Sequence, residues 1–282
     1  MEDESVLKML VGTYTEGTGS KGVYLYEFDT ATLEARLLDC AFAPNPSFVI
    51  PSDDRRVAYS VSETSDGSHG VYSFELTDST INVLNKREGS GSSPCNIVIA
   101  GGNVLTSDYG DGTLTVFPLL PDGRVAEKSF SYDPGADVES HIHCAVVSPD
   151  GKYLFFTDLG ADAVYRATII PDSNPEDFRT AYSFDRTAHP GPRHMVFSTD
   201  GRNAYLLGET GDCVTVFAYD DGELRHISTE MAYDGRGHGS ADIHISPDGR
   251  FLYTSHRLKE DGISLFKVNA DTGVPERVAY FK

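Results

Sequence analysis

The side chains that could do acid–base or anion-binding chemistry recur at fixed distances from five evenly spaced turns. Five positions before each turn residue stand Ser47, Cys95, His143, Arg193 and Ala241. Eleven positions after it stand Glu63, Glu209 and Arg257, with Asp108 and Asp158 near the equivalent place in their repeats. Imidazole, guanidinium and carboxylate groups gathered at one place are what binding and turnover of a small anionic molecule require.

Neighbouring residues extend these two sets. His141 shares strand parity with His143, and His194 and His256 each stand next to an arginine. Taken singly, each is more typical of a loop residue or a hydrogen-bonded strand end, and only the whole set favours a shared site. His244 lies outside both sets, and we expect it to be structural or exposed.

The positioning elements follow from an internal repeat. Taking Ser52, Ala100, Ser148, Ser198 and Ser246 as equivalent, the steps are 48, 48, 50 and 48 residues. Each step reads as an apolar strand, a turn written Ser-Pro-Asp-Gly or a remnant of it, and further strands rich in Tyr, Leu and Val. Asp-Gly between apolar runs indicates hairpins, and a period of this length is typical of a β-propeller.

We therefore predict an all-β chain, a β-propeller of four-stranded antiparallel blades forming a single domain over residues 1–282. The repeat places the blades as follows: an incomplete first blade at 8–42, then blades near 45–88, 93–133, 141–187, 191–231 and 239–282. The first blade lacks the strand that would precede its first apolar run. About six blades are thus expected in this chain.

The composition restricts the kinds of molecule that the chain is expected to bind. Asp and Glu number 43 against 23 Lys and Arg, a net charge of −20, so nucleic acid and anionic membrane surfaces are repelled. Four cysteines without metal spacing indicate free thiols and a reducing, cytoplasmic compartment. No apolar run approaches the length of a membrane span. The oligomeric state is left open.

Several kinds of chemistry lack their motifs. The Gly-Thr-Gly-Ser run at 17–20 lies in a hairpin with no following helix, so it is a turn and not a phosphate loop. No serine stands in a nucleophile elbow, and the cysteines have no basis for special reactivity, which disfavours covalent catalysis. We expect no cofactor and no metal.

Long phrases of the chain resemble one known family. They include LVGTYTEG, NPSFVIPSDDRRVAYSVSE, SSPCNIVIAGG, HIHCAVVSPDGKYLFFTDLGADAVY, GPRHMVFSTDGRNAYLLGE and SADIHISPDGRFLYTSHR. These are similar to the seven-bladed propeller lactonases, which include a bacterial type of 6-phosphogluconolactonase and the carboxy-muconate lactonizing enzymes. The resemblance spans nearly the whole chain. It implies seven blades, of which the last is expected to be missing here.

The resemblance also implies a site and an activity. The family's proposed His, Glu and two Arg fall on His143, Glu209, Arg193 and Arg257, which we take as candidate catalytic residues. Candidate substrate-binding residues are His141, His194, His256, Cys95 and Asp108. The implied activity is hydrolysis of a small anionic sugar lactone, with 6-phosphogluconolactone in the pentose phosphate pathway as first choice.

Other functions stay open at this point. The same propeller could cyclise a muconate-type dicarboxylate, or it could be a non-catalytic binding module. Calcium-dependent propeller lactonases hold their metal with carboxylates, and Glu63, Asp108, Asp158 and Glu209 could supply them. The Arg and His residues among these carboxylates argue against a bound cation.

Overall fold

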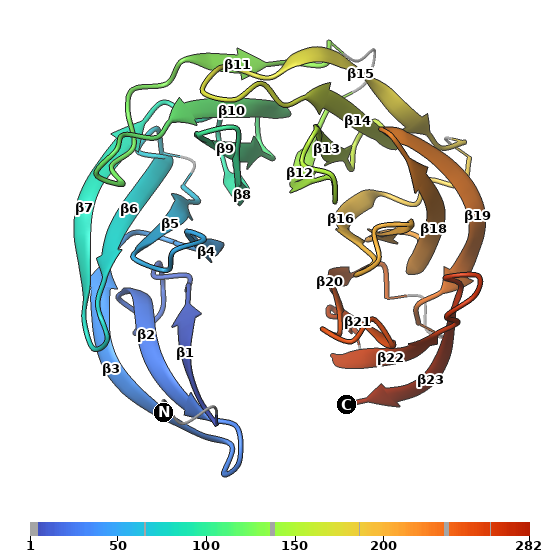
Figure 1. Ribbon diagram of the computed structural model, residues 1–282, viewed down its shortest axis with the longest axis horizontal. Helices are drawn as coiled ribbons and strands as arrows, with labels where there is room; N and C mark the ends of the chain where they lie inside the picture. Colours follow the sequence, from blue (N-terminus) through green and yellow to red (C-terminus); the bar gives the residue numbers. More distant parts are fainter. Residues whose placement is uncertain (1–4, 65, 136–138, 186, 234–236, 260) are drawn as a thin grey trace. The chain divides into compact units, whose positions relative to one another are not determined.

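The regular elements of the chain are β-strands joined by turns. The computed structural model describes residues 5–64, 66–135, 139–185, 187–233, 237–259 and 261–282. The strands form six antiparallel sheets (Figure 1). The chain divides into two compact units, one of Met1–Asp133 with Asp172–Asn174, the other of Pro134–Pro171 with Pro175–Lys282. Each unit contains three sheets.

The first unit holds the sheets of the N-terminal half. The first sheet contains β1 (Val6–Val11), β2 (Gly22–Asp29) and β3 (Glu34–Phe42). The second contains β4 (Val49–Pro51), β5 (Val57–Ser62), β6 (Gly70–Leu76) and β7 (Ile81–Glu88). The third contains β8 (Pro94–Ala100), β9 (Asn103–Asp108), β10 (Thr113–Pro118) and β11 (Phe130–Tyr132). In each sheet, strands pair in sequence order.

The second unit repeats this plan with three four-stranded sheets. The fourth sheet contains β12 (Ile142–Val147), β13 (Tyr153–Asp158), β14 (Ala163–Thr168) and β15 (Glu176–Ser183). The fifth contains β16 (Pro192–Phe197), β17 (Asn203–Gly208), β18 (Cys213–Asp220) and β19 (Glu223–Met231). The sixth contains β20 (Ser240–Ile245), β21 (Phe251–His256), β22 (Gly262–Val268) and β23 (Pro275–Phe281). The predicted all-β architecture of mainly four-stranded antiparallel blades, with a three-stranded first blade, is confirmed.

The repeated turn joins the first two strands of a sheet through side-chain hydrogen bonds. In the fourth sheet Ser148 Oγ donates to Asp150 Oδ1 at 2.6 Å and accepts from the Tyr153 backbone N–H at 3.0 Å. Gly151 has φ 72°, a conformation that L side chains rarely adopt. The same serine–aspartate bond recurs in Ser52–Asp54, Ser198–Asp200 and Ser246–Asp248. The third sheet makes this turn with Gly101–Gly102, also at positive φ.

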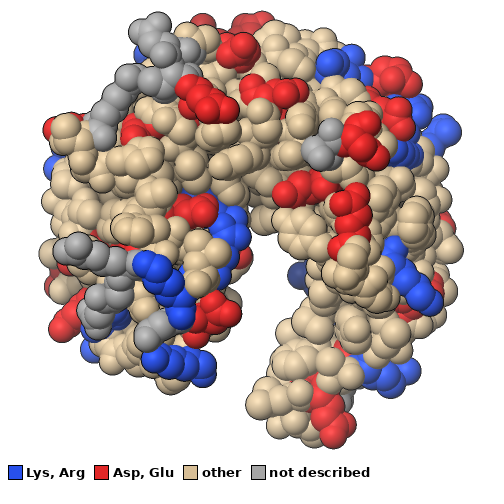
Figure 2. Space-filling view, turned by 180° about the vertical axis from the view of Figure 1, so that it is seen from behind, with Lys and Arg blue, Asp and Glu red and all other residues tan. Residues whose placement is uncertain are grey.

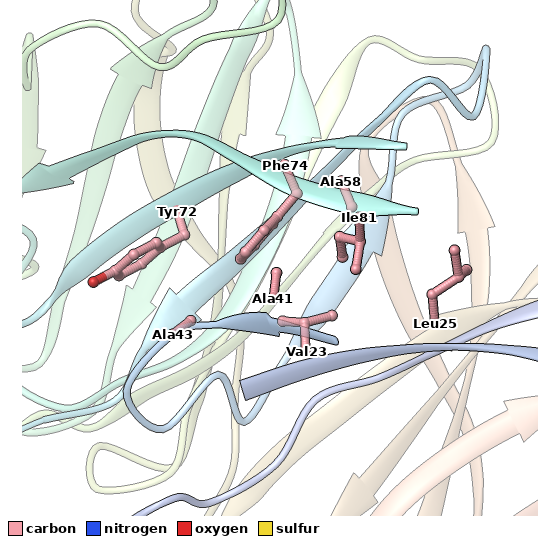
Figure 3. Close-up of a cluster of buried hydrophobic side chains, with 8 residues drawn as sticks. All are labelled: Val23, Leu25, Ala41, Ala43, Ala58, Tyr72, Phe74 and Ile81. Carbon is pink, nitrogen blue, oxygen red and sulfur yellow. The ribbon is translucent and has the colours of Figure 1, made fainter. Parts of the chain in front are cut away.

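Apolar side chains fill the space between neighbouring sheets of a unit. Figure 3 shows the cluster between the first and second sheets, formed by Val23, Leu25, Ala41, Ala43, Ala58, Tyr72, Phe74 and Ile81. In the second unit, Phe155 and Val164 pack against Met195 and Phe217 of the fifth sheet. A sheet can bury both of its faces only by packing against the neighbouring sheets. Within each unit, the order of the sheets therefore decides which strand ends lie close together.

Candidate active site

In four sheets, a β-bulge interrupts the first strand at the position five residues before the turn. The register shifts lie between Pro94 and Asn96, Ile142 and Cys144, Pro192 and His194, and Ser240 and Ile243. The residues inside them are Cys95, His143, Arg193, and Ala241 with Asp242. A bulge places an extra residue against its partner strand and re-aims the side chains. Candidate residues therefore stand where regular pairing is locally broken.

In the second unit, one carboxylate binds two guanidinium groups. Arg193 Nε donates to Glu209 Oε2 at 2.7 Å, and Arg257 Nη2 donates to Glu209 Oε1 at 2.8 Å. The side chains of Arg193 and Glu209 are 13% and 17% exposed, whereas that of Arg257 is 45% exposed. Partial burial strengthens these ion pairs relative to surface pairs. Two cations around one anion leave this cluster with a net positive charge.

Backbone contacts hold the arginine–glutamate cluster in place. Arg193 Nη1 donates to the carbonyl oxygen of Ala241 in the bulge of β20. Thr157 Oγ1 on β13 donates to the Arg193 carbonyl at 2.6 Å, and the Glu209 N–H donates to the Gly191 carbonyl at 2.8 Å. The cluster is thus tied to all three sheets of its unit. At the left of Figure 2, basic and acidic side chains lie close together on the surface of the second unit.

Two histidine rings lie beside this cluster. His143 in the bulge of β12 is 5% exposed, and its ring lies edge-on to that of His194, with centroids 5.2 Å apart and planes at 68°. Burial, reinforced by the positive charges of Arg193 and Arg257, holds the pKa of His143 well below its usual range. Burial also lowers the pKa of His194. Both rings are therefore neutral at pH 7.

A carboxylate on β20 bonds to the second of these rings. Asp242 Oδ1 lies 2.6 Å from His194 Nδ1, and Asp242 Oδ2 lies 2.9 Å from His244 Nε2. Burial acts against ionisation of Asp242, but the two histidine hydrogen bonds outweigh it and leave its pKa below the usual range. The bond to Asp242 raises the pKa of His244. Sequence reasoning missed Asp242, although it directly follows a residue of the first spaced set, and it took His244 as structural or exposed; the His244 side chain is indeed 73% exposed.

Two other predicted histidines of this unit have different surroundings. The ring nitrogens of His256 lie 3.0 Å from Ser240 Oγ and 2.9 Å from Thr254 Oγ1, and its ring stacks on Tyr233. These contacts make His256 part of the packing of the sixth sheet. The His141 ring reaches Glu139, 3.9 Å from its Nε2 to the carboxylate. The partners of His256 thus belong to the sixth sheet and the segment before it, and Glu139 lies in the segment before β12.

Two predicted binding residues belong to the first unit. Asp108 ends β9 and is fully buried, where its Oδ2 accepts hydrogen bonds from Thr115 Oγ1 at 2.6 Å and from the Gly91 N–H at 2.9 Å. Burial raises the pKa of Asp108 to about 6. Cys95 Sγ lies 3.6 Å from the Ser107 carbonyl. These contacts are made within the third sheet.

The first unit has a polar cluster of its own, part of which the spacing had indicated. Glu63 Oε2 accepts hydrogen bonds from Ser47 Oγ and, at 2.8 Å, from the Tyr14 hydroxyl. Asn45 binds the same region, with Oδ1 accepting from the Thr15 N–H at 2.9 Å and Nδ2 donating to the Glu63 carbonyl at 3.1 Å. Tyr14 lies on a loop outside the repeat arithmetic, which is why sequence reasoning missed it.

The structure also shows the surroundings of the four cysteine thiols and bears on the question of a metal site. Cys144 and Cys213 are buried, Cys40 and Cys95 are partly buried, and none of the four forms a disulfide. Within the described ranges, no group of three or more His, Cys, Asp or Glu residues has the geometry to hold a metal ion. Across those same residues, no helix is long and apolar enough to cross a membrane.

The chain is similar in sequence and in structure to several known proteins. Residues 8–282 match the family model described as "Lactonase, 7-bladed beta-propeller". A 6-phosphogluconolactonase of Formosa agariphila is 30% identical, over 96% of this chain and 82% of its own length. A solved structure from Bacteroides uniformis is 41% identical with a TM-score of 0.93, covering 99% of this chain and 83% of its own. A periplasmic gluconolactonase of Pseudomonas aeruginosa is 29% identical with a TM-score of 0.88, over 98% and 83%.

Proposed function

Because this chain belongs to the seven-bladed β-propeller lactonase family, we propose that it hydrolyses 6-phosphogluconolactone to 6-phosphogluconate. The observation that carries the proposal is the Glu209 carboxylate held between Arg193 and Arg257 beside the buried ring of His143. Two cations next to a neutral imidazole suit a substrate with a phosphate at one end and an ester carbonyl at the other. The activity named for the Formosa agariphila relative supports the same substrate.

In this proposal, His143 is the general base. Its lowered pKa keeps the ring unprotonated at pH 7, so that it can take a proton from water as the water oxygen bonds to the lactone carbonyl carbon. The bond between that carbon and the ring oxygen then breaks, and the departing oxygen receives the proton from His143. The products are a hydroxyl group and a carboxylic acid, which ionises in solution.

The two arginines and the glutamate have separate roles in this proposal. Both carboxylate oxygens of Glu209 already accept guanidinium hydrogen bonds, so we assign it to orienting the arginines and not to abstracting a proton. Arg193, nearly buried, suits stabilisation of the oxyanion that develops on the carbonyl. Arg257, almost half exposed, suits the phosphate of an incoming substrate.

The compartment is part of the proposal. We place the protein in the cytoplasm, supported by its four cysteines, none of which forms a disulfide, as fits a reducing environment. The Pseudomonas aeruginosa gluconolactonase is named periplasmic, so the fold alone does not decide the compartment. Fractionation of cells producing the tagged full-length protein tests this part separately from the activity.

The activity test compares two lactones that differ in one phosphate. Wild-type protein should hydrolyse freshly made 6-phosphogluconolactone with a higher kcat/KM than gluconolactone. The substitution Arg257→Ala should lower kcat/KM for the phosphorylated lactone by about 10- to 100-fold through KM, and should change gluconolactone hydrolysis little. The matched control is Arg250→Ala, because Arg250 lies in the turn just before β21, is 71% exposed and pairs with Asp248.

Other outcomes would favour other functions. Equal losses on both lactones in Arg257→Ala would remove Arg257 from phosphate binding. Cyclisation of a muconate-type dicarboxylate without lactone hydrolysis would favour a lactonizing enzyme. A folded protein that turns over neither compound, but binds 6-phosphogluconate, would favour a binding module.

A further inference from the structure

A carboxylate links a buried histidine of one sheet to an exposed histidine of the next. Asp242 on β20 lies 2.6 Å from Nδ1 of His194 on β16 and 2.9 Å from Nε2 of His244 on its own strand. The side chain of His194 is 10% exposed and that of His244 is 73% exposed. The three groups thus extend from the interior of the second unit to solvent.

The chemistry of a carboxylate fixes the protons in this chain of contacts. An ionised carboxylate only accepts hydrogen bonds, so each facing ring nitrogen must carry the proton. Neutral His194 is then protonated at Nδ1, and its lone pair is on Nε2. The Ile243 N–H also donates to Asp242 Oδ1 at 2.9 Å, which restricts rotation of the carboxylate. Asp242 therefore selects both the tautomer and the ring orientation of His194.

The bulges connect this pair to the candidate active site. His194 directly follows Arg193 in the bulge of β16, and its ring lies edge-on to that of His143. Asp242 directly follows Ala241 in the bulge of β20, and the Ala241 carbonyl accepts a hydrogen bond from Arg193. A substitution of Asp242 would therefore affect His143 through the ring of His194. It would affect Arg193 through the backbone of Ala241.

Charges from three sheets and from the segment after β21 act on these groups. The titratable and charged groups near the histidine–aspartate pair are His143 and Cys144 on β12, Arg193 on β16, Asp242 and His244 on β20, and Arg257 after β21. Burial lowers the pKa of His194 most, the hydrogen bond and charge of Asp242 oppose that effect, and the charges of Arg193 and His244 add to it. Asp242 and His244 therefore act on His194 in opposite directions.

We propose that Asp242 is a positioning residue of the lactonase site, which holds His194 against His143 in the Nδ1-protonated form, while His244 adjusts this hold with pH from the solvent side. This inference rests on the proposed function. Asp242 itself touches no substrate in this scheme. It acts by fixing the ring that packs on the general base.

The pH dependence has a definite sign. Protonated His244 adds a positive charge beside Asp242, which disfavours a second positive charge on His194. Removing His244 should therefore raise the pKa of His194, so that His194 becomes protonated at a higher pH than in wild type. Removing the Asp242 charge should lower the pKa of His194. The two substitutions thus move one titration in opposite directions.

The test is a nitrogen-detected NMR titration of ¹⁵N-histidine-labelled protein between about pH 5 and 9, the range in which histidines titrate. Wild-type His194 should show the Nδ1-protonated tautomer. Asp242→Asn should lower its titration midpoint and weaken that tautomer, and His244→Gln should raise the midpoint. The control is Asp221→Asn, which removes an exposed carboxylate that lies 2.8 Å from Lys152 Nζ.

Kinetics of the same variants complete the test. With 6-phosphogluconolactone, Asp242→Asn should lower kcat at least about tenfold with a smaller change in KM, because a misplaced ring costs rate more than affinity. An Nε2-protonated His194 in wild type, or a midpoint unmoved by Asp242→Asn, would overturn the inference, as would an unchanged kcat. If wild type hydrolyses no lactone, the proposed function fails, while the tautomer and midpoints still decide whether Asp242 positions His194.

Discussion

The Ser47–Glu63 pair of the first unit and the Arg193–Glu209 pair of the second unit occupy the same places in their repeats. In both pairs the residues are sixteen positions apart, and the earlier residue donates a hydrogen bond to Oε2 of the glutamate. The repeat therefore fixes the geometry of the contact in both units. The residue type alone decides what that geometry can do.

The third member of each cluster makes the two sites chemically different. In the first unit it is the Tyr14 hydroxyl, whose pKa is raised to about 12 by partial burial and by Glu63, so that it remains a neutral donor. In the second unit it is the Arg257 guanidinium, which is always charged. One cluster is an anion with two neutral donors, and the other is an anion with two cations. Only the second can attract a phosphate or stabilise an oxyanion.

A second pair of equivalent residues differs in the same way. Asp108 and Asp158 end the second strands of their sheets, but they receive different hydrogen bonds. Asp158 Oδ1 accepts from the backbone N–H groups of His141 and Ala161, both at 2.9 Å. Asp108 Oδ2 accepts two threonine hydroxyls and the Gly91 N–H, while its Oδ1 is buried without a hydrogen-bond partner among the described residues. One carboxylate oxygen of Asp108 therefore has no hydrogen bond among the described residues that would stabilise the ionised form.

The largest expected effect on stability comes from this difference. Burial raises the pKa of Asp108 in the folded protein to about 6, above its value in the unfolded chain. Its contribution to stability is therefore complete below about pH 4 and is lost as the pH rises through about 6. Asp108→Asn removes the buried charge and should raise the free energy of unfolding at pH 8 by up to about 3 kcal/mol, with little gain at pH 4.

Asp158→Asn provides the contrast, measured by urea unfolding at the same two pH values. It weakens hydrogen bonds to backbone N–H groups, so it should lower the free energy of unfolding by about 1–3 kcal/mol at pH 8. If Asp108→Asn destabilised the protein at pH 8 as much as Asp158→Asn, the two sites would not differ in the way described.

A smaller effect is expected at the first unit's cluster. Tyr14→Phe removes one hydroxyl donor from Glu63 on a residue that is 55% exposed. The free energy of unfolding should fall by about 0.5–1 kcal/mol, and lactone hydrolysis should be unchanged. Urea unfolding and a kcat/KM measurement on the same sample check both. A large loss of activity in Tyr14→Phe would mean that this cluster also takes part in the reaction.

The repeat predicts much of this structure because it is local in sequence. A hairpin turn written Ser-Pro-Asp-Gly, or Ser-Thr-Asp-Gly at Ser198, fixes the pairing of the strands on either side of it. Arg193 and Glu209 stand five residues before and eleven after Ser198, distances that recur in other repeats. Counting along the chain placed Arg193, Glu209 and Arg257 in the two spaced sets, and the structure shows the hydrogen bonds that join their side chains. The family resemblance of the surrounding phrases added the lactonase activity, which spacing alone could not supply.

Other features depend on details that a repeat does not encode. The bulges at His143 and Arg193 cannot be read from the spacing, nor can the bulge of β20 that contains Asp242, the partner of His194. His256 stands next to Arg257 of the second spaced set, yet Ser240 and Thr254 engage its ring nitrogens. Tyr14 comes from a loop whose course is set by its hydrogen bonds to Asn45.

The central claim is that equal geometry in the two units carries catalysis in only one of them, and a matched pair of substitutions tests it most directly. Steady-state hydrolysis of 6-phosphogluconolactone should be measured for Glu209→Gln and Glu63→Gln beside wild type. We predict a loss of about 100-fold in kcat/KM for Glu209→Gln, since the arginines lose the anion that orients them, and less than about twofold for Glu63→Gln. Equal losses in the two variants, or a fully active Glu209→Gln, would contradict the claim.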